Sequence, residues 1–116
     1  MQWYPVQSIE GVDELVARSA ENPILIFKHS TRCGISSLAL DRLIRQWNEE
    51  VMPSVKPVMV DVIANRSISD YIADRFNIIH ESPQAIILSQ GEVVYHTSHM
   101  GINFAAIESV IRPLLK

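Results

Sequence analysis

The sequence predicts an α/β fold in which a mixed sheet of four to five strands carries helices on both faces. Segments with apolar residues at helical spacing alternate along the chain with short runs of branched apolar residues, which are typical of strands buried on both sides of a sheet. Strands separated by helices are joined by parallel crossovers. The last two predicted strands are separated only by a short turn, which favours an antiparallel hairpin.

In the first half of the chain, the patterns predict a helix, a strand and a second helix. Apolar residues recur on one helical face from residue 12 to residue 20. The continuous apolar run Ile24–Phe27 is predicted to be a buried strand. A longer helical pattern covers residues 35–51, and we expect Pro53 to end it because proline cannot continue a helix.

The second half continues this alternation and closes with a hairpin and a helix. We predict strands over residues 58–62, 84–88 and 93–96, and helices over residues 67–76 and 103–115. Ser67 and Asp70 have the spacing of a helix-capping pair at the start of the middle helix. Gln90-Gly91-Glu92 is expected to form the turn of the hairpin.

Length and charge restrict the class of protein. The 116 residues suit a single domain over residues 1–116, with a core that needs no metal or disulfide. The formal net charge of −3 argues against a nucleic-acid partner, because phosphate binding usually requires a basic surplus. No apolar run approaches the roughly 20 residues that span a bilayer, so we expect no membrane partner. We expect a cytoplasmic monomer or weak dimer.

Cys33 is the single cysteine of the sequence, which excludes an internal disulfide and a cysteine-rich zinc site. It follows a predicted buried strand and the polar segment 29–32, and it opens a predicted helix. Unpaired N–H groups and the helix dipole favour a thiolate at such a position, and Arg32 adds positive charge nearby. We therefore predict a reactive thiol; the alternative is a buried, inert cysteine.

Three motifs resemble those of the monothiol bacilliredoxins, the bacillithiol-system proteins of the YtxJ type. They are Phe-Lys-His-Ser-Thr-Arg-Cys-Gly-Ile-Ser at residues 27–36, Glu-Ser-Pro-Gln-Ala at 81–85 and His-Thr-Ser-His at 96–99. The resemblance extends over essentially the whole chain. It implies a thioredoxin-like fold and a thiol-disulfide oxidoreductase that reduces mixed disulfides between proteins and bacillithiol. The family's nucleophilic cysteine corresponds to Cys33.

The resemblance also implies roles for the residues around Cys33. Ser36 stands where a Cys-x-x-Cys motif has its second cysteine, so Cys33 takes over the small thiol, which a second free thiol then releases. We expect Arg32 to bind a carboxylate of bacillithiol. The N–H groups of Ile35 and Ser36, and the Ser36 hydroxyl, are expected to bind the thiolate. Gly34 departs from the family pattern, which has proline and a stiffer first turn at this substrate-binding position.

Ser82-Pro83 lies directly before a predicted strand. A proline in this place is ordinarily trans. In the family, however, the corresponding proline is cis and faces the reactive cysteine. The resemblance therefore implies that Ser82 offers its N–H and C=O to a bound substrate, in the manner of an added strand.

Partners and alternatives follow from the same comparison. The resemblance implies no bound cofactor, bacillithiol as a low-molecular-weight thiol co-substrate, and S-bacillithiolated client proteins as partners. Cys33 to Ser36 is also similar to the Cys-Gly-Phe-Ser motif of glutaredoxins that carry an iron–sulfur cluster, although their Gly-Gly-x-Asp stretch is missing here. A further alternative is a non-enzymatic thioredoxin-fold adaptor with a slowly alkylated cysteine. The histidines lack the spacing of metal ligands, so no metal site is expected.

Overall fold

The computed structural model describes residues 2–52 and 54–115 and contains a five-stranded mixed sheet. The strands are β1 (Tyr4–Pro5), β2 (Ile24–His29), β3 (Lys56–Asp61), β4 (Gln84–Ser89) and β5 (Glu92–Ser98). The helices are α1 (Ile9–Arg18), α2 (Gly34–Gln46), α3 (Arg66–Phe76) and α4 (Phe104–Ile111), with 3₁₀ turns η1 (His99–Gly101) and η2 (Arg112–Leu114).

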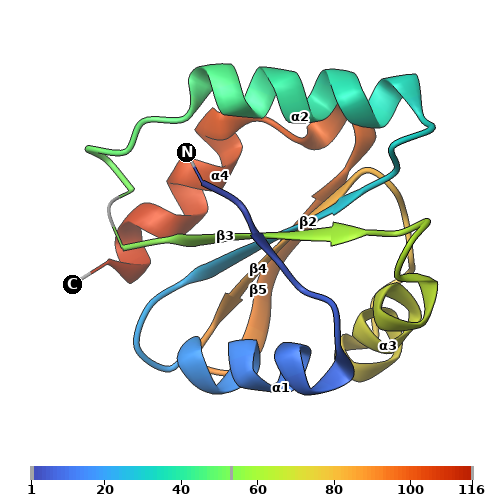
Figure 1. The fold of residues 1–116 in the computed structure, drawn as a ribbon. Coiled ribbons are helices and arrows are strands. Elements are labelled where there is room, and N and C mark those ends of the chain that lie inside the picture. Colours follow the sequence, from blue (N-terminus) through green and yellow to red (C-terminus); the bar gives the residue numbers. More distant parts are fainter. Residues whose placement is uncertain (1, 53, 116) are drawn as a thin grey trace.

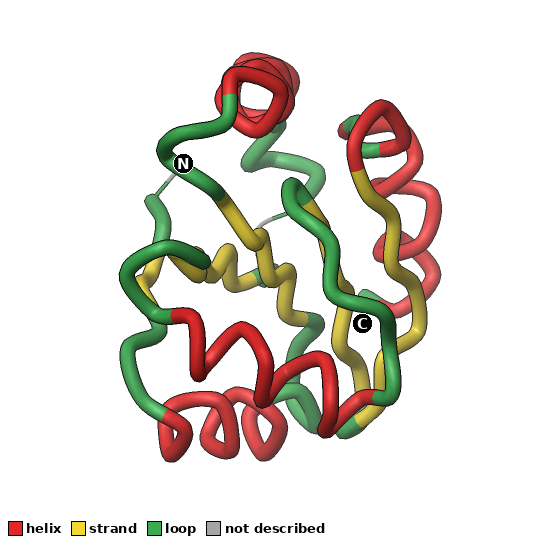
Figure 2. Tube along the Cα trace, turned by 90° about the vertical axis from the view of Figure 1, so that its right-hand side faces the viewer, coloured by secondary structure: helices red, strands yellow, loops and turns green. Residues whose placement is uncertain are grey.

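The sheet has the strand order β1-β3-β2-β4-β5. β1 and β2 both pair with β3 in parallel, whereas β4 runs antiparallel to β2 and β5 antiparallel to β4. Helices α2 and α4 lie together on one face, and α1 and α3 cover the other (Figure 1). Figure 2, viewed from the side at which β2 and β3 end, shows the three layers. The predicted fold class is confirmed.

Two hydrophobic clusters, one on each face of the sheet, form the core. Ile24 and Ile26 of β2 belong to the cluster under α1 and α3. Leu25 and Phe27 belong to the cluster under α2 and α4. All four side chains are buried, because consecutive residues of a strand point to opposite faces and both faces are covered. This explains why the strand appears in the sequence as an uninterrupted apolar run.

The end of α2 differs from the prediction. The helix stops at Gln46, and Trp47 has the extended backbone angles φ −62° and ψ 132°. Trp47 packs edge-on against Phe104 of α4 with a ring separation of 5.5 Å, and Met52 is fully buried. The apolar residues after 46 therefore reach the core from a loop, although their spacing in the sequence resembles that of a helix. Pro53, the expected helix stop, lies outside the described residues.

One local prediction at another element end was wrong, and one strand was not predicted. α3 begins at Arg66 after the N-cap residue Asn65, without a side-chain cap, so Ser67 is inside the helix and caps nothing. β1 is a strand of only two residues, too short to give a periodic signal. The hairpin prediction is confirmed, since Gln90 and Gly91 have the positive φ angles of 55° and 78° that a tight turn between β4 and β5 requires.

Candidate active site

Cys33 is the N-cap residue of α2 and is partly exposed. Its N–H donates to the Ser30 carbonyl at 3.1 Å, which closes a tight turn between β2 and the helix. Its carbonyl accepts the N–H of Ser37 at 3.1 Å, the first hydrogen bond of the helix. No side chain caps this end among the described residues, so the N–H groups of residues 34–36 remain available. The cysteine thus stands at an uncapped helix N-terminus, in the setting that the sequence predicted.

Ser36 is fully buried beneath the first turn and binds back to the end of β2. Its Oγ lies 2.7 Å from Nδ1 of His29 and accepts the Ser30 N–H at 3.1 Å. Burial lowers the pKa of His29 from its ordinary value, and the nearby Asp61 carboxylate partly opposes this. The contact between Nδ1 of His29 and the Ser36 hydroxyl is a hydrogen bond between side chains. The structure therefore gives the Ser36 hydroxyl a different partner from the thiolate that the sequence suggested.

His29 belongs to the motif and to the polar segment before Cys33, but no role at the site was predicted for it from the sequence. It lies on the same face of β2 as Phe27, with a ring separation of 6.1 Å, so it points toward α2. The available signal was the period of two along β2, which places residues 25, 27 and 29 on one face. A polar residue at the end of this series indicates a buried polar partner, and Ser36 is that partner.

The Ser82–Pro83 peptide bond is cis, as the resemblance implied. Antiparallel pairing of Lys28 with Gln84 brings the start of β4 to the end of β2, so Pro83 reaches the edge of the sheet from which the Cys33 loop leaves. The Pro83 carbonyl accepts the His99 N–H at 3.1 Å. Within the part of the chain that the structure describes, the backbone N–H and C=O of Ser82 have no hydrogen-bond partner, and its buried Oγ has none.

Lys28 lies on the other face of β2 from His29 and is fully buried. Its Nζ donates to the Ser69 carbonyl of α3 at 3.0 Å and lies 3.2 Å from Nδ1 of His80. Burial lowers the pKa of Lys28 to about 8, while the Asp70 carboxylate opposes the shift. Burial, followed by the positive charge of Lys28, lowers the pKa of His80. Lys28 thereby ties α3 to the segment that precedes Pro83.

The other predicted binding residues lie at the surface around Cys33. Arg32 is exposed, and Ile35 leaves 56% of its surface open. Gly34 is the first residue of α2, and a Cβ built on it meets no atom within 4 Å. The structure therefore gathers Arg32, Gly34, Ile35 and Cys33 at one end of α2. Ser36 lies below them, facing His29.

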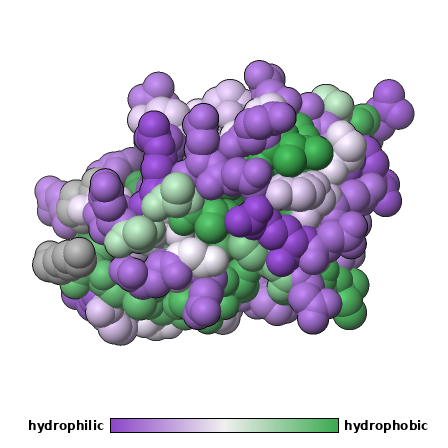
Figure 3. Space-filling view, turned by 90° about the horizontal axis from the view of Figure 1, so that it is seen from below, coloured by the Kyte–Doolittle hydropathy of each residue, from purple (hydrophilic) through white to green (hydrophobic). Residues whose placement is uncertain are grey.

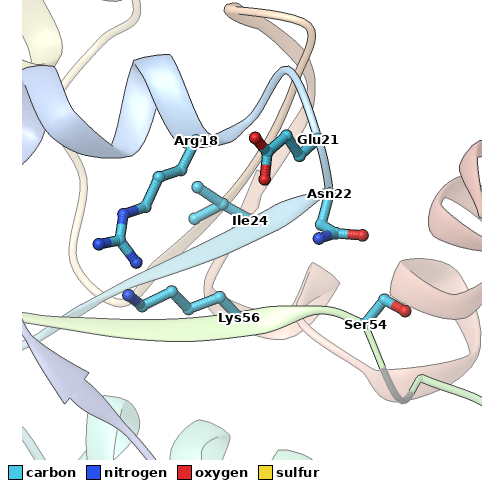
Figure 4. A pocket seen from close by; sticks show the side chains of 6 residues that line it. All are labelled: Arg18, Glu21, Asn22, Ile24, Ser54 and Lys56. Carbon is cyan, nitrogen blue, oxygen red and sulfur yellow. The ribbon is translucent and has the colours of Figure 1, made fainter.

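A cavity of about 330 Å³ lies where β2 and β3 begin, at the opposite end of these strands from Cys33. In Figure 4, Arg18, Glu21 and Asn22 approach it from α1 and the turn that follows, and Ser54 and Lys56 approach it at β3. It opens beside Ile24, at the beginning of β2, whereas Cys33 follows the end of that strand. The length of β2, roughly 20 Å at 3.3 Å per residue, separates the two sites. A group bound to Cys33 does not reach this cavity.

Comparison with known proteins agrees with this geometry. Residues 4–107 match the family model described as monothiol bacilliredoxin BrxC. The chain belongs to this family. It is also similar to a solved thioredoxin-fold protein described as a candidate oxidoreductase, with 29% identity, 91% of this chain and 90% of that chain covered, and a TM-score of 0.78.

Two thioredoxins of lower identity share the fold of this bacilliredoxin. The one from Fasciola hepatica is 16% identical over 94% of this chain and 96% of its own, with a TM-score of 0.70. The one from Malassezia sympodialis is 13% identical over 97% and 90%, with a TM-score of 0.72. The family and the 29% identical neighbour support a thiol oxidoreductase with a thioredoxin fold. Among the described residues, no helix is long and apolar enough to cross a membrane.

Proposed function

We propose that this bacilliredoxin removes bacillithiol from S-bacillithiolated client proteins through Cys33. The observation that carries the proposal is that Cys33 stands at the start of α2 and is followed, three residues later, by Ser36. Cys33 is partly exposed at an uncapped helix N-terminus, and Ser36 occupies the place of a second redox cysteine. A single thiol in this setting exchanges with a mixed disulfide and cannot resolve it internally.

The proposed reaction balances as two thiol–disulfide exchanges. The Cys33 thiolate attacks the bacillithiol sulfur of the mixed disulfide, the old S–S bond breaks, and the client cysteine leaves as a thiolate that takes a proton from water. A new S–S bond joins Cys33 to bacillithiol. A second low-molecular-weight thiol, in thiolate form, then attacks the bacillithiol sulfur. It leaves as the small disulfide and restores Cys33.

Neighbouring residues support this sequence of steps. The free N–H groups of residues 34–36 are available as hydrogen-bond donors to the Cys33 sulfur when it attacks and when it leaves. The unpaired backbone groups of Ser82 are available to a client strand. Arg32 is exposed and has no ion-pair partner among the described residues, so its charge is free for a carboxylate of bacillithiol.

The test uses a bacillithiolated client protein, with mass spectrometry of both proteins over time. The wild type is expected to release the client thiol and to gain the mass of bacillithiol on Cys33. Cys33→Ala is expected to do neither. An adduct-free wild type with an unreduced client, or a client that Cys33→Ala still reduces, contradicts the proposal. Slow alkylation of Cys33 at neutral pH would favour the adaptor alternative.

A further inference from the structure

A groove begins at Ile35, two residues after Cys33, and follows the exposed side of α2. It has a volume of about 420 Å³. Its walls and ends are formed by Ile35, Leu38, Ala39, Arg42, Arg45, His99 and Met100. The residues from α2 are spaced so that they share one helix face, while His99 and Met100 come from η1. The groove thus runs from the reactive end of α2 toward its C-terminal half.

The walls of the groove are apolar, and their side chains are open to solvent. Leu38 leaves 67% and Met100 78% of its surface exposed, and Ala39 is buried as the floor. The face of the molecule formed by α1 and α3 shows apolar patches scattered among hydrophilic side chains (Figure 3). Exposed apolar side chains gathered around a hollow indicate an interaction site, whereas single ones do not.

The far end of the groove is cationic. Arg42 donates from Nη2 to the Ile102 carbonyl at 2.8 Å, so it bridges the helix and the segment after η1. Arg45 is exposed, and its Nε donates only to the backbone carbonyl of Asp41 at 3.4 Å. None of the residues lining the groove in the described part of the chain is acidic. The charge of Arg45 is therefore available to a carboxylate from outside.

The η1 wall is held in place by the Pro83 loop. The His99 N–H donates to the Pro83 carbonyl, and His99 has a positive φ of 52°. A Cβ at Gly101 would lie 2.2 Å from Thr97 Oγ1, so a side chain at this position would have to displace the Thr97 hydroxyl. The η1 wall of the groove is therefore tied to the Pro83 loop by a backbone hydrogen bond, which limits the ordering cost of binding.

We propose that this groove binds the client polypeptide next to its modified cysteine, and that it selects an apolar side chain followed by a carboxylate. This inference rests on the proposed function. The apolar walls suit a leucine-like side chain rather than a sugar or another polar group. Ten residues of helix separate Ile35 from Arg45, roughly 15 Å. An extended segment covers that distance in about five residues.

The kinetic test compares two kinds of mixed disulfide with bacillithiol. One kind is a set of synthetic ten-residue peptides, each with one cysteine and a leucine two residues away. Glutamate or lysine stands about five residues beyond the leucine. Each peptide is made twice, with these residues on the N-terminal side or on the C-terminal side of the cysteine. The other is the mixed disulfide of bacillithiol with 2-mercaptoethanol. The variants are Leu38→Ser and Arg45→Glu. The matched controls, Val94→Ser on β5 and Arg18→Glu on α1, change exposed residues far from the groove.

The expected results are changes in specificity. Leu38→Ser lowers the ratio of kcat/KM for the glutamate peptide to that for the small disulfide about tenfold. Arg45→Glu removes or reverses a severalfold preference for the glutamate peptide over the lysine peptide, most strongly at low salt. The controls leave both ratios within twofold. Unchanged ratios in Leu38→Ser and Arg45→Glu overturn the proposal. An equal loss on both substrates also overturns it, because the groove would then bind the bacillithiol moiety.

A binding experiment separates this proposal from the proposed function. The glutamate peptide with serine in place of its cysteine is titrated into the Cys33→Ala protein while backbone amide resonances are recorded. Shifts concentrated in α2 and η1, weakened in Leu38→Ser, support the groove even if the wild type reduces no bacillithiolated substrate. Absence of such shifts at millimolar peptide overturns it. Shifts that depend on protein concentration alone also overturn it, because a second copy of the chain would then occupy the groove.

Discussion

Lys28 and His29 are neighbours at the end of β2, and they face opposite sides of the sheet. Lys28 is buried under α3, where its charge has a carbonyl and an imidazole as partners and, among the described residues, no carboxylate in contact. His29 points to α2, where Ser36 satisfies Nδ1 and an Asp61 carboxylate lies near. Each side chain contacts a segment of the active site. Lys28 contacts His80 in the segment before Pro83, and His29 contacts Ser36 beneath the turn that contains Cys33. The difference is that one site keeps a charge in the core and the other keeps a neutral hydrogen bond.

The largest expected effect comes from removing the buried charge. Lys28→Met keeps most of the side-chain volume and is expected to raise the free energy of unfolding at pH 7 by about 2 kcal/mol. The pKa lowered from 10.5 to about 8 reflects the cost of burying the ammonium, which the variant removes. The hydrogen bonds lost with the ammonium make this gain smaller. Lys56→Met, at a less buried lysine, is the matched control and should change stability by under about 0.5 kcal/mol. Urea denaturation measures both.

The same variant sharpens the comparison through pH. Because the pKa of Lys28 is lower in the folded protein, the unfolded chain holds an extra proton between about pH 8 and 10.5. Stability therefore gains a contribution as the pH rises through this window, and Lys28→Met should lose that contribution while Lys56→Met keeps it. Denaturation at pH 7 and pH 9.5 checks the sign. A wild type and a Lys28→Met protein with parallel pH profiles would refute this explanation.

The second effect concerns the neutral site. Ser36→Ala leaves Nδ1 of His29 and the N–H of Ser30 without a partner in a half-buried place, and should cost about 2 kcal/mol of stability. Ser37→Ala, one residue along and exposed, is the control and should cost well under 1 kcal/mol. A small loss in Ser36→Ala equal to that in Ser37→Ala would mean that the bond contributes little.

The smallest effect concerns Gly34, on the surface above Ser36. Cys33 has φ −109° and ψ 116°, which a following proline accepts, and the position is the first of the helix and open to solvent. Gly34→Pro should therefore raise stability by about 0.5 kcal/mol by restricting the unfolded chain. Gly34→Ala keeps the N–H, so comparing thiol exchange rates of the two variants isolates that donor. A lower melting temperature in Gly34→Pro would show that the backbone does not fit.

The sequence allowed the sheet, the helices and the position of Cys33 to be predicted, because each depends on periodic burial or on local helix-end chemistry. It did not allow the partners of Lys28 and His29 to be predicted. Their contacts, Ser69 with His80 and Ser36 respectively, lie on other elements and depend on how α2 and α3 pack against the sheet. The groove was not predicted either. Leu38 and Met100 are far apart in the sequence, and they line the same groove because η1 lies against α2 in the fold.

The two-residue strand β1 has a consequence for how the molecule behaves in a crowded solution. The N–H of Val6, the residue after β1, donates to the Met59 carbonyl of β3. Because the backbone groups of successive strand residues point in opposite directions, those of Pro5 face the open edge of the sheet. Proline has no N–H to offer there, and Lys56 places its ammonium 4.7 Å from the Tyr4 ring centre. A strand from another molecule finds almost no ladder to extend. This border of the sheet therefore resists strand-to-strand aggregation.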